Sequence, residues 1–205
     1  KEIYEKDIVR FEMMKHLGYF ITESSHHLGE YVPYFRTSEE RRKTYCEPRW
    51  FYLEICKESW KPHYDQVKRQ IRGEVPLEIC RSHEYAADII YSMETGMPCR
   101  INGNIENKQL VTNLPQRCCV EVPCLVDKGG IHPCFVGDLP PQCAALNRTS
   151  VNVQELAVKA AVEKDRTAAF QAVMFDPLTS ALLAPRDIEK MVKEMLKAEG
   201  KWIRP

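Results

Sequence analysis

The sequence has 205 residues, a formal net charge of zero and nine cysteines. A globular chain of this length buries roughly 70% of its unfolded surface, so one domain can fold around its own core. The balanced charge gives no electrostatic attraction to nucleic acid or to an anionic membrane surface, and we expect neither as a partner. No apolar run reaches the roughly 18 residues that would span a bilayer.

The cysteines indicate a reducing environment. Their number is odd, and Cys118 and Cys119 are neighbours, so they cannot all pair within one chain. In a strand these two side chains point to opposite faces, which favours buried structural thiols over a zinc site. We therefore predict a cytoplasmic protein whose thiols stay reduced.

The chain begins in helical sequence. Tyr4, Ile8 and Phe11 recur at spacings of three and four, and Gly18 predicts the end of the helix. A domain rarely begins in the middle of a helix that has no capping residue. We therefore expect this chain to be part of a longer protein whose N-terminal part is missing.

The next segment, "GYFITESSHHLGEYVPYF" (residues 18–35), concentrates polar and aromatic side chains. One hypothesis is a metal site at His26, His27 and Glu30, because imidazole and carboxylate bind divalent cations. We expect Gly29 to interrupt any helix that would place these three on one face, which weakens that hypothesis. A second hypothesis is general acid or base catalysis, or hydrogen bonding to sugar hydroxyls. Its candidate residues are Glu23, His27, Glu30, Tyr31 and Tyr34. The third is a solvated loop.

Residues from about 38 to 72 predict helix, with a break or kink near Pro48 and another near Pro62. The apolar stripe of this stretch comprises Trp50, Leu53, Cys56, Trp60, Tyr64, Val67 and Ile71. Ser82 predicts the start of another helix that runs to about Glu94.

Short β-rich segments follow, separated by turn residues. They predict strands within 99–105, 108–115, 118–127 and 130–137, the last two joined as a hairpin. Helical periodicity returns from Pro140 to Lys164, from Arg166 to Phe175 and from Pro185 to Ala198. Helices surrounding a small, mainly antiparallel sheet make an α+β fold, which we expect to form a single domain over residues 1–205.

Three segments resemble glycoside hydrolase family 4. They read "DIVRFEMMKHLGYFITESSHHLGEYVPYF", "RINGNIENKQLVTNLPQRCCVEVPCLVDKGGIHPCFVGDLP" and "NVQELAVKAAVEKDRTAAFQAVMFDPLTS". They are most similar to the bacterial α-galactosidases of that family. The resemblance implies the C-terminal domain of a lactate/malate-dehydrogenase-like glycosidase, whose NAD-binding Rossmann domain would lie upstream of residue 1.

The resemblance also implies a mechanism that departs from the two-carboxylate scheme of most glycosidases. NAD⁺ takes hydride from C3 of an α-galactoside, a base takes the C2 proton, and the leaving group is eliminated from C1. Mn²⁺ polarises the developing ketone. Both cofactors would be held mainly by the upstream part, so this chain would supply the other wall of the sugar site.

An ungapped alignment on Gly18 brings the base of relatives, an aspartate or tyrosine, to Ser24. Serine is a poor base without a partner, so Glu23, His27 or a water are the alternatives. Glu30 can orient His27. The expected substrate-binding residues are Glu30, Tyr31 and Asn113.

Several alternatives stay open at this point. Within the family they are an α-glucosidase, an α-galacturonidase and a 6-phosphoglycosidase; an acidic substrate needs a cationic clamp, for which Arg41, Arg42 and Lys43 are candidates. A structural and oligomerisation module without catalysis is an alternative of another class, and a dehydrogenase is a further one. We expect a homo-oligomer, either a dimer or a tetramer, from the resemblance.

Overall fold

The computed structural model describes residues 2–46 and 52–200. Its helices are α1 (Glu2–Lys6), α2 (Ile8–Leu17), α3 (Ser25–Tyr31), α4 (Glu39–Tyr45), α5 (Tyr52–Ile71), α6 (Ala86–Thr95), α7 (Pro141–Glu163), α8 (Arg166–Phe175), α9 (Pro177–Leu182) and α10 (Pro185–Ala198). Its strands are β1 (Cys99–Glu106), β2 (Cys119–Asp127) and β3 (Gly130–Pro133). The predicted interruption near Pro48 and the stripe residue Trp50 lie outside the described residues.

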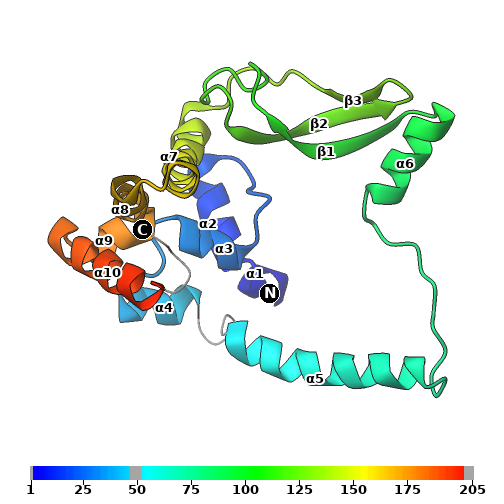
Figure 1. The fold of residues 1–205 in the computed structure, drawn as a ribbon, viewed down its shortest axis with the longest axis horizontal. Helices are drawn as coiled ribbons and strands as arrows, with labels where there is room; N and C mark the ends of the chain where they lie inside the picture. The colour runs from blue at the N-terminus through cyan, green and yellow to red at the C-terminus, as the bar shows by residue number, and fades with distance from the viewer. Residues whose placement is uncertain (1, 47–51, 201–205) are drawn as a thin grey trace.

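The three strands form one antiparallel sheet in the order β1-β2-β3, with helices at both of its ends (Figure 1). Asp127 pairs with Gly130, so the predicted hairpin closes through a two-residue turn. The buried residues of β2 are Val120, Val122, Cys124 and Val126, which alternate with more exposed ones, as a strand with one covered face requires. The α+β prediction is confirmed.

The two adjacent cysteines differ in burial, as side chains on opposite faces should, but the prediction of buried thiols holds for only one of them. Cys118 is buried and Cys119 is exposed. Burial raises the pKa of Cys118 above its ordinary value, which favours the neutral thiol. No disulfide joins the cysteines of the described chain.

The segment 108–115 is not the predicted strand. Asn107 is fully buried, and its Nδ2 donates to the carbonyl oxygens of Val111, Leu114 and Pro115, at 2.9, 3.3 and 2.9 Å. Its Oδ1 accepts from the backbone N–H groups of Leu110 and Val111. These bonds take backbone groups that a strand would have paired, and the segment forms a loop with one isolated bridge from Val111 to Gly137.

The helices have a hydrophobic core separate from that of the sheet. It is formed by α2, α3 and the residues after α3, and consists of Val9, Met13, Leu28, Val32 and Phe35. The predicted helix end at Gly18 is confirmed: this glycine has φ 80°, and its N–H donates to the carbonyl of Met14. Beside this core, α7 packs along α8, and α8 contacts α9 and α10. The short helix α9 is not among the predicted helices.

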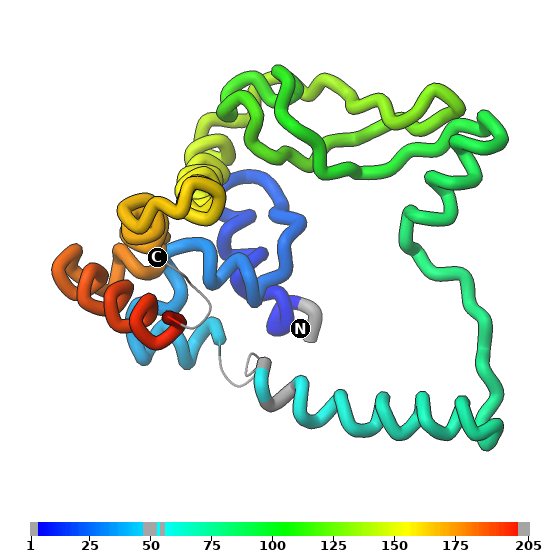
Figure 2. The backbone as a smooth tube through the Cα atoms, viewed as in Figure 1, coloured from blue at the N-terminus to red at the C-terminus, as the bar shows by residue number. Residues whose placement is uncertain are grey.

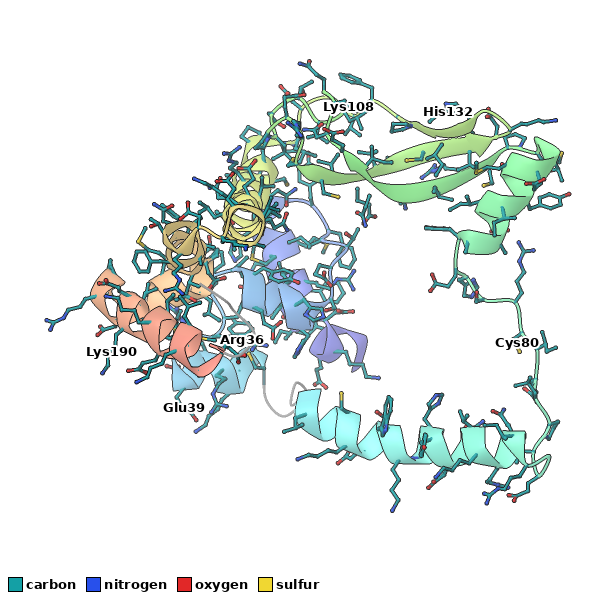
Figure 3. The ribbon with its side chains drawn as sticks, in the orientation of Figure 1. Arg36, Glu39, Cys80, Lys108, His132 and Lys190 are labelled. Carbon is teal, nitrogen blue, oxygen red and sulfur yellow. The ribbon has the colours of Figure 1, made fainter. Side chains whose placement is uncertain are left out.

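Helix α5 lies apart from the rest of the molecule. Figure 2 traces the chain from α5 through an extended stretch to α6 at the far end of the sheet. In the part of the chain that the structure describes, α5 packs along no other helix or strand. The predicted stripe is therefore exposed: Trp60 is 69% and Ile71 80% accessible, and side chains of α5 project into open space in Figure 3.

Two details of the predicted helices are corrected. No break occurs at Pro62: the helix continues through it, although a proline inside a helix costs about 3 kcal/mol. Ser82 does not cap α6: its hydroxyl accepts the N–H of Glu84, and the helix begins at Ala86. Within the described residues, no helix has the length and apolar character needed to cross a bilayer.

Candidate functional site

The segment 18–35 holds the candidate site, and it is more helical than the sequence indicated. An extended stretch follows Gly18, and α3 then spans Ser25–Tyr31. Ser24 is the N-cap of α3, because its Oγ accepts the backbone N–H of His27 at 3.3 Å. This hydroxyl therefore has a structural role at the start of the helix.

The expectation that Gly29 would interrupt a helix is wrong. Glycine costs a helix about 1 kcal/mol relative to alanine. In α3 it belongs to the buried face together with Ser25 and Leu28, and packing of that face overrides the local propensity. As a result His26, His27 and Glu30 do meet: each offers a ligand atom, and these atoms lie within 4.8 Å of one another.

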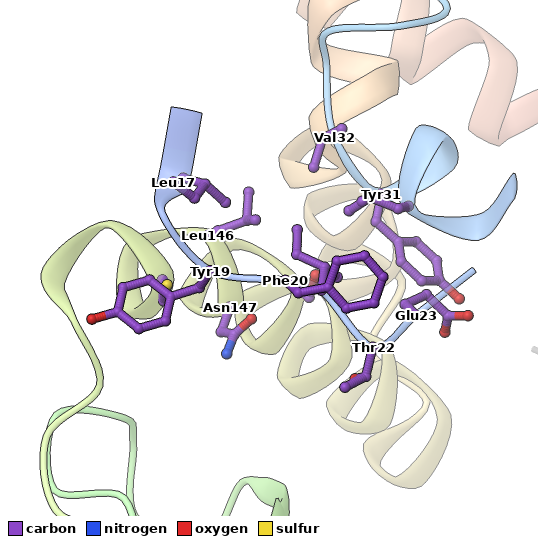
Figure 4. A pocket seen from close by; sticks show the side chains of 13 residues that line it. Leu17, Tyr19, Phe20, Thr22, Glu23, Tyr31, Val32, Leu146 and Asn147 are labelled. Carbon is purple, nitrogen blue, oxygen red and sulfur yellow. The ribbon is translucent and has the colours of Figure 1, made fainter. Parts of the chain in front are cut away.

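A pocket of about 270 Å³ lies between the stretch 19–23, α3 and α7; we call it the Tyr31 pocket. In Figure 4, Phe20, Thr22, Glu23 and Tyr31 gather on one side of the view, with Tyr19 on the other. Its walls thus combine aromatic rings with one carboxylate, and the volume is slightly below that of ordinary small-molecule sites. Such a pocket suits a single sugar ring, whose apolar face packs on an aromatic side chain and whose hydroxyls need hydrogen bonds.

Glu23 is the carboxylate among the described residues that line the Tyr31 pocket. One of its oxygens, Oε1, accepts the backbone N–H of Ser24 at 2.7 Å, which fixes the carboxylate beside the start of α3. Its other oxygen has no hydrogen-bond partner in the described residues. A carboxylate held in this way can accept a proton or a sugar hydroxyl hydrogen bond.

The outer side of α3 carries the other ionisable side chains. Glu30 Oε2 lies 3.1 Å from His27 Nδ1, and Glu30 Oε1 lies 3.5 Å from His26 Nε2. Arg36 Nη2 is 3.4 Å from the same Oε1. The expected orientation of His27 by Glu30 is thus possible, but neither of these two residues lines the Tyr31 pocket. The His27 ring stacks on the ring of Tyr31, with the two ring centroids 6.1 Å apart. His27 therefore supports the Tyr31 wall of the pocket without lining it.

The donor set of this cluster suits a divalent metal chemically, since two imidazoles and a carboxylate are common ligands. Two electrostatic features oppose it. The guanidinium of Arg36 already supplies positive charge to Glu30, and the two histidines lie in the first turn of α3, where the helix dipole disfavours a cation. We therefore interpret the cluster as an ion-paired carboxylate.

Asn113 does not line the Tyr31 pocket and has a structural role instead. Its amide makes a pair of bonds with the backbone of Leu139: Nδ2 donates to the carbonyl at 2.8 Å, and Oδ1 accepts the N–H at 3.0 Å. Asn113 thereby ties the loop 108–118 to the start of α7. Among the residues expected to bind substrate, Tyr31 lines the Tyr31 pocket, whereas Glu30 and Asn113 do not.

Helix α7 contributes pocket residues that sequence reasoning missed. Asn147 and Ser150 line the Tyr31 pocket, and neither side chain has a hydrogen-bond partner among the described residues. With Gln154 they follow the spacing i, i+3, i+7 of one helix face. That spacing was visible in the sequence, but only the fold shows that this face meets the segment 18–35.

The sequence of this chain is similar to those of known proteins. Residues 1–179 match the sequence profile of the family 4 glycosyl hydrolase C-terminal domain. An α-galactosidase of Bacillus subtilis is 42% identical over 96% of this chain and 46% of its own length. One of Rhizobium meliloti is 34% identical over 97% of this chain and 42% of its own.

Solved structures give the same fold. That of lplD from Bacillus subtilis superposes with a TM-score of 0.78 at 25% identity, over 92% of this chain and 42% of that one. A 6-phospho-alpha-glucosidase from gut microorganisms, in complex with NAD and Mn²⁺, gives 0.71 at 16% identity, over 96% and 42%. At 16% identity the likeness shows the fold alone.

The fold and the profile together define a carbohydrate-enzyme domain. The chain belongs to the glycosyl hydrolase family 4, as its C-terminal domain. It spans less than half the length of the curated relatives that it matches.

Proposed function

We propose that this chain is the substrate-binding and oligomerisation domain of a glycosidase that hydrolyses α-galactosides. The observation that carries the proposal is the lining of the Tyr31 pocket, which combines aromatic rings, neutral polar groups and the Glu23 carboxylate. No Lys, Arg or His is among the described residues that line it. Two α-galactosidases are also among the relatives with more than 30% identity.

This lining favours a neutral sugar over an acidic one. A uronic acid or a phosphate is usually bound by a bidentate arginine or another cation. The candidate clamp on α4 is engaged elsewhere: Arg42 and Lys43 pair with Glu39, and Arg41 donates to Thr37 at 2.6 Å. The α-galacturonidase and 6-phosphoglycosidase alternatives therefore have no support from these residues, whereas an α-glucosidase differs from the leading proposal only in the hydroxyl configuration of its substrate.

The cofactors of the proposed reaction are NAD and Mn²⁺, held by other parts of the protein. The described sheet is antiparallel and offers no βαβ unit, so these residues do not fit a dinucleotide. NAD would supply the oxidation at C3 that makes the C2 proton acidic, ahead of deprotonation and elimination.

The contribution of this chain is binding and proton transfer. Glu23 is the proposed base for the C2 proton, since it lines the Tyr31 pocket whereas Ser24 and His27 do not. Tyr31 and Phe20 would pack on the apolar face of the sugar and exclude water. The His27–Glu30 pair would position Tyr31, not react.

Hydrolysis assays on the full-length protein test this proposal. Methyl α-galactoside should be cleaved only when NAD⁺ and Mn²⁺ are both present, and the product formed in deuterated water should carry deuterium at C2. The corresponding α-galacturonide and 6-phosphoglucoside should be cleaved far more slowly. Cleavage that persists after both cofactors are removed, or a faster reaction with an acidic substrate, would overturn it.

A second role, oligomerisation, is favoured by α5. Six residues of its stripe fall within about 80° of the helix circumference at 100° per residue. Those with large side chains, Leu53, Trp60, Tyr64 and Ile71, are all more than half exposed. An exposed stripe of this kind marks an interaction surface, and we propose a homo-oligomer in the cytoplasm. A monomer in sedimentation equilibrium of the full-length protein would contradict this.

A further inference from the structure

A second pocket adjoins the Tyr31 pocket along α7. It encloses about 420 Å³, and we call it the Gln154 pocket. Thr22, Asn147 and Ser150 line both pockets, so the two form one continuous groove with these three side chains between them. Gln154 lines only the second.

The lining of the Gln154 pocket is about equally apolar and polar, and part of its apolar wall is held by hydrogen bonds. Val111 and Leu114 come from the loop that buried Asn107 holds through five hydrogen bonds, and Leu139 is tied to Asn113. A wall that the fold holds in place, next to convergent polar groups, suits a small polar molecule. The fold therefore fixes this part of the wall.

Its polar groups are neutral donors and acceptors with spare capacity. Thr22, Asn147, Ser150 and Gln154 have no side-chain hydrogen bond within the described part of the chain. Glu121 is the ionised residue among its described lining, and no Lys, Arg or His is among them. Amide and hydroxyl groups can both donate and accept, which matches the hydroxyls of a sugar, whereas a carboxylate at the rim disfavours an anion.

We propose that the Gln154 pocket is a binding site for a second neutral sugar unit, the one that leaves when an α-galactosyl disaccharide is cleaved. The Tyr31 pocket takes the galactosyl ring, and its volume leaves no space for another ring. The second ring then lies along α7, where Gln154 hydrogen bonds to its hydroxyls and Leu114 and Leu139 cover its apolar face. This inference rests on the proposed function, because it assigns the galactosyl ring to the Tyr31 pocket.

The test compares two substrates of the full-length enzyme: an α-galactosyl disaccharide, and methyl α-galactoside, whose leaving group cannot fill the Gln154 pocket. Gln154→Ala should lower kcat/KM for the disaccharide by about five-fold, the effect of one neutral hydrogen bond, and leave methyl α-galactoside unchanged. Asn147→Ala should lower both, because Asn147 lines both pockets. Asn152→Ala, about 200° around α7 from Gln154 and outside both linings, is the matched control and should change neither.

The outcomes separate the two proposals. If the wild type cleaves methyl α-galactoside and Gln154→Ala leaves the disaccharide rate unchanged, or lowers both rates equally, the second sugar site is wrong and the proposed function stands. If the wild type cleaves no α-galactoside, the proposed function fails and the second site falls with it. Since Gln154 is exposed, a folding defect is not expected, and unchanged thermal unfolding of the variant confirms that point.

Discussion

The two sides of the segment 18–35 carry similar chemistry but differ in what they face. On one side Glu23 and Tyr31 line a pocket; on the other His26, His27 and Glu30 pair with one another and with Arg36. The outer side carries the two histidines and the glutamate, whose spacing resembles that of metal ligands. The pocket side borders a cavity, whereas the outer side faces solvent. Residue type and position beside the pocket therefore rank these groups in opposite orders, and the experiments below measure the difference between the two sides.

Glu23→Gln should give the largest effect. The amide keeps the shape of the side chain but cannot take a proton, so kcat for an α-galactoside should fall by about 100-fold or more. KM should change little, because the hydrogen bond to the Ser24 N–H survives at the amide oxygen. Steady-state kinetics on the full-length protein measure both, with Glu155→Gln on the exposed surface of α7 as the control. A wild-type rate for Glu23→Gln would remove Glu23 as the base.

Tyr31→Ala should come next, with KM for the sugar raised about ten-fold through the loss of an aromatic wall. Tyr31→Phe keeps the ring and should stay within about three-fold of the wild type. The pair of variants separates packing from hydroxyl chemistry. If Tyr31→Phe loses kcat as severely as Glu23→Gln, the tyrosine hydroxyl and not the carboxylate is the base.

Ser24→Ala should lower the free energy of unfolding by about 1 kcal/mol, because α3 loses the side-chain acceptor for the N–H of His27. Ser24→Asp keeps an acceptor at the N-cap and should restore that stability in chemical denaturation. Activity should follow the same order. If Ser24→Asp restores stability but leaves kcat far below that of the wild type, the hydroxyl has a chemical role beyond the cap.

Much of this fold could be predicted from local sequence signals, and the errors have physical causes. Gly18, the turn at Lys128 and Gly129, and the prolines that begin α7 and α10 encode their structure within a few residues. The loop around Asn107 could not be predicted in that way, since a single buried amide organises backbone groups up to eight residues away. The predicted helix interruption at Gly29 is wrong because packing of α3 overrides the low helix propensity of glycine. The groove could not be predicted from local signals either, because it forms only where α7 packs beside the segment 18–35, more than 100 residues away in the sequence.

His27→Gln should have the smallest effect of the series. The imidazole lies outside the pocket and acts by stacking on Tyr31 and pairing with Glu30, so kcat should change less than about three-fold, within the range of an exposed hydrogen bond. Any weakening of substrate binding should appear as a higher KM, because the Tyr31 ring is held less firmly. The pH dependence of kcat should keep its wild-type form. Glu30→Gln, which leaves the ring in place but weakens its partner, should behave in the same way. A loss of kcat in His27→Gln that equals that of Glu23→Gln, together with a displaced pH profile, would reverse the assignment of the two sides, because it would place the reacting base on the outer face of α3.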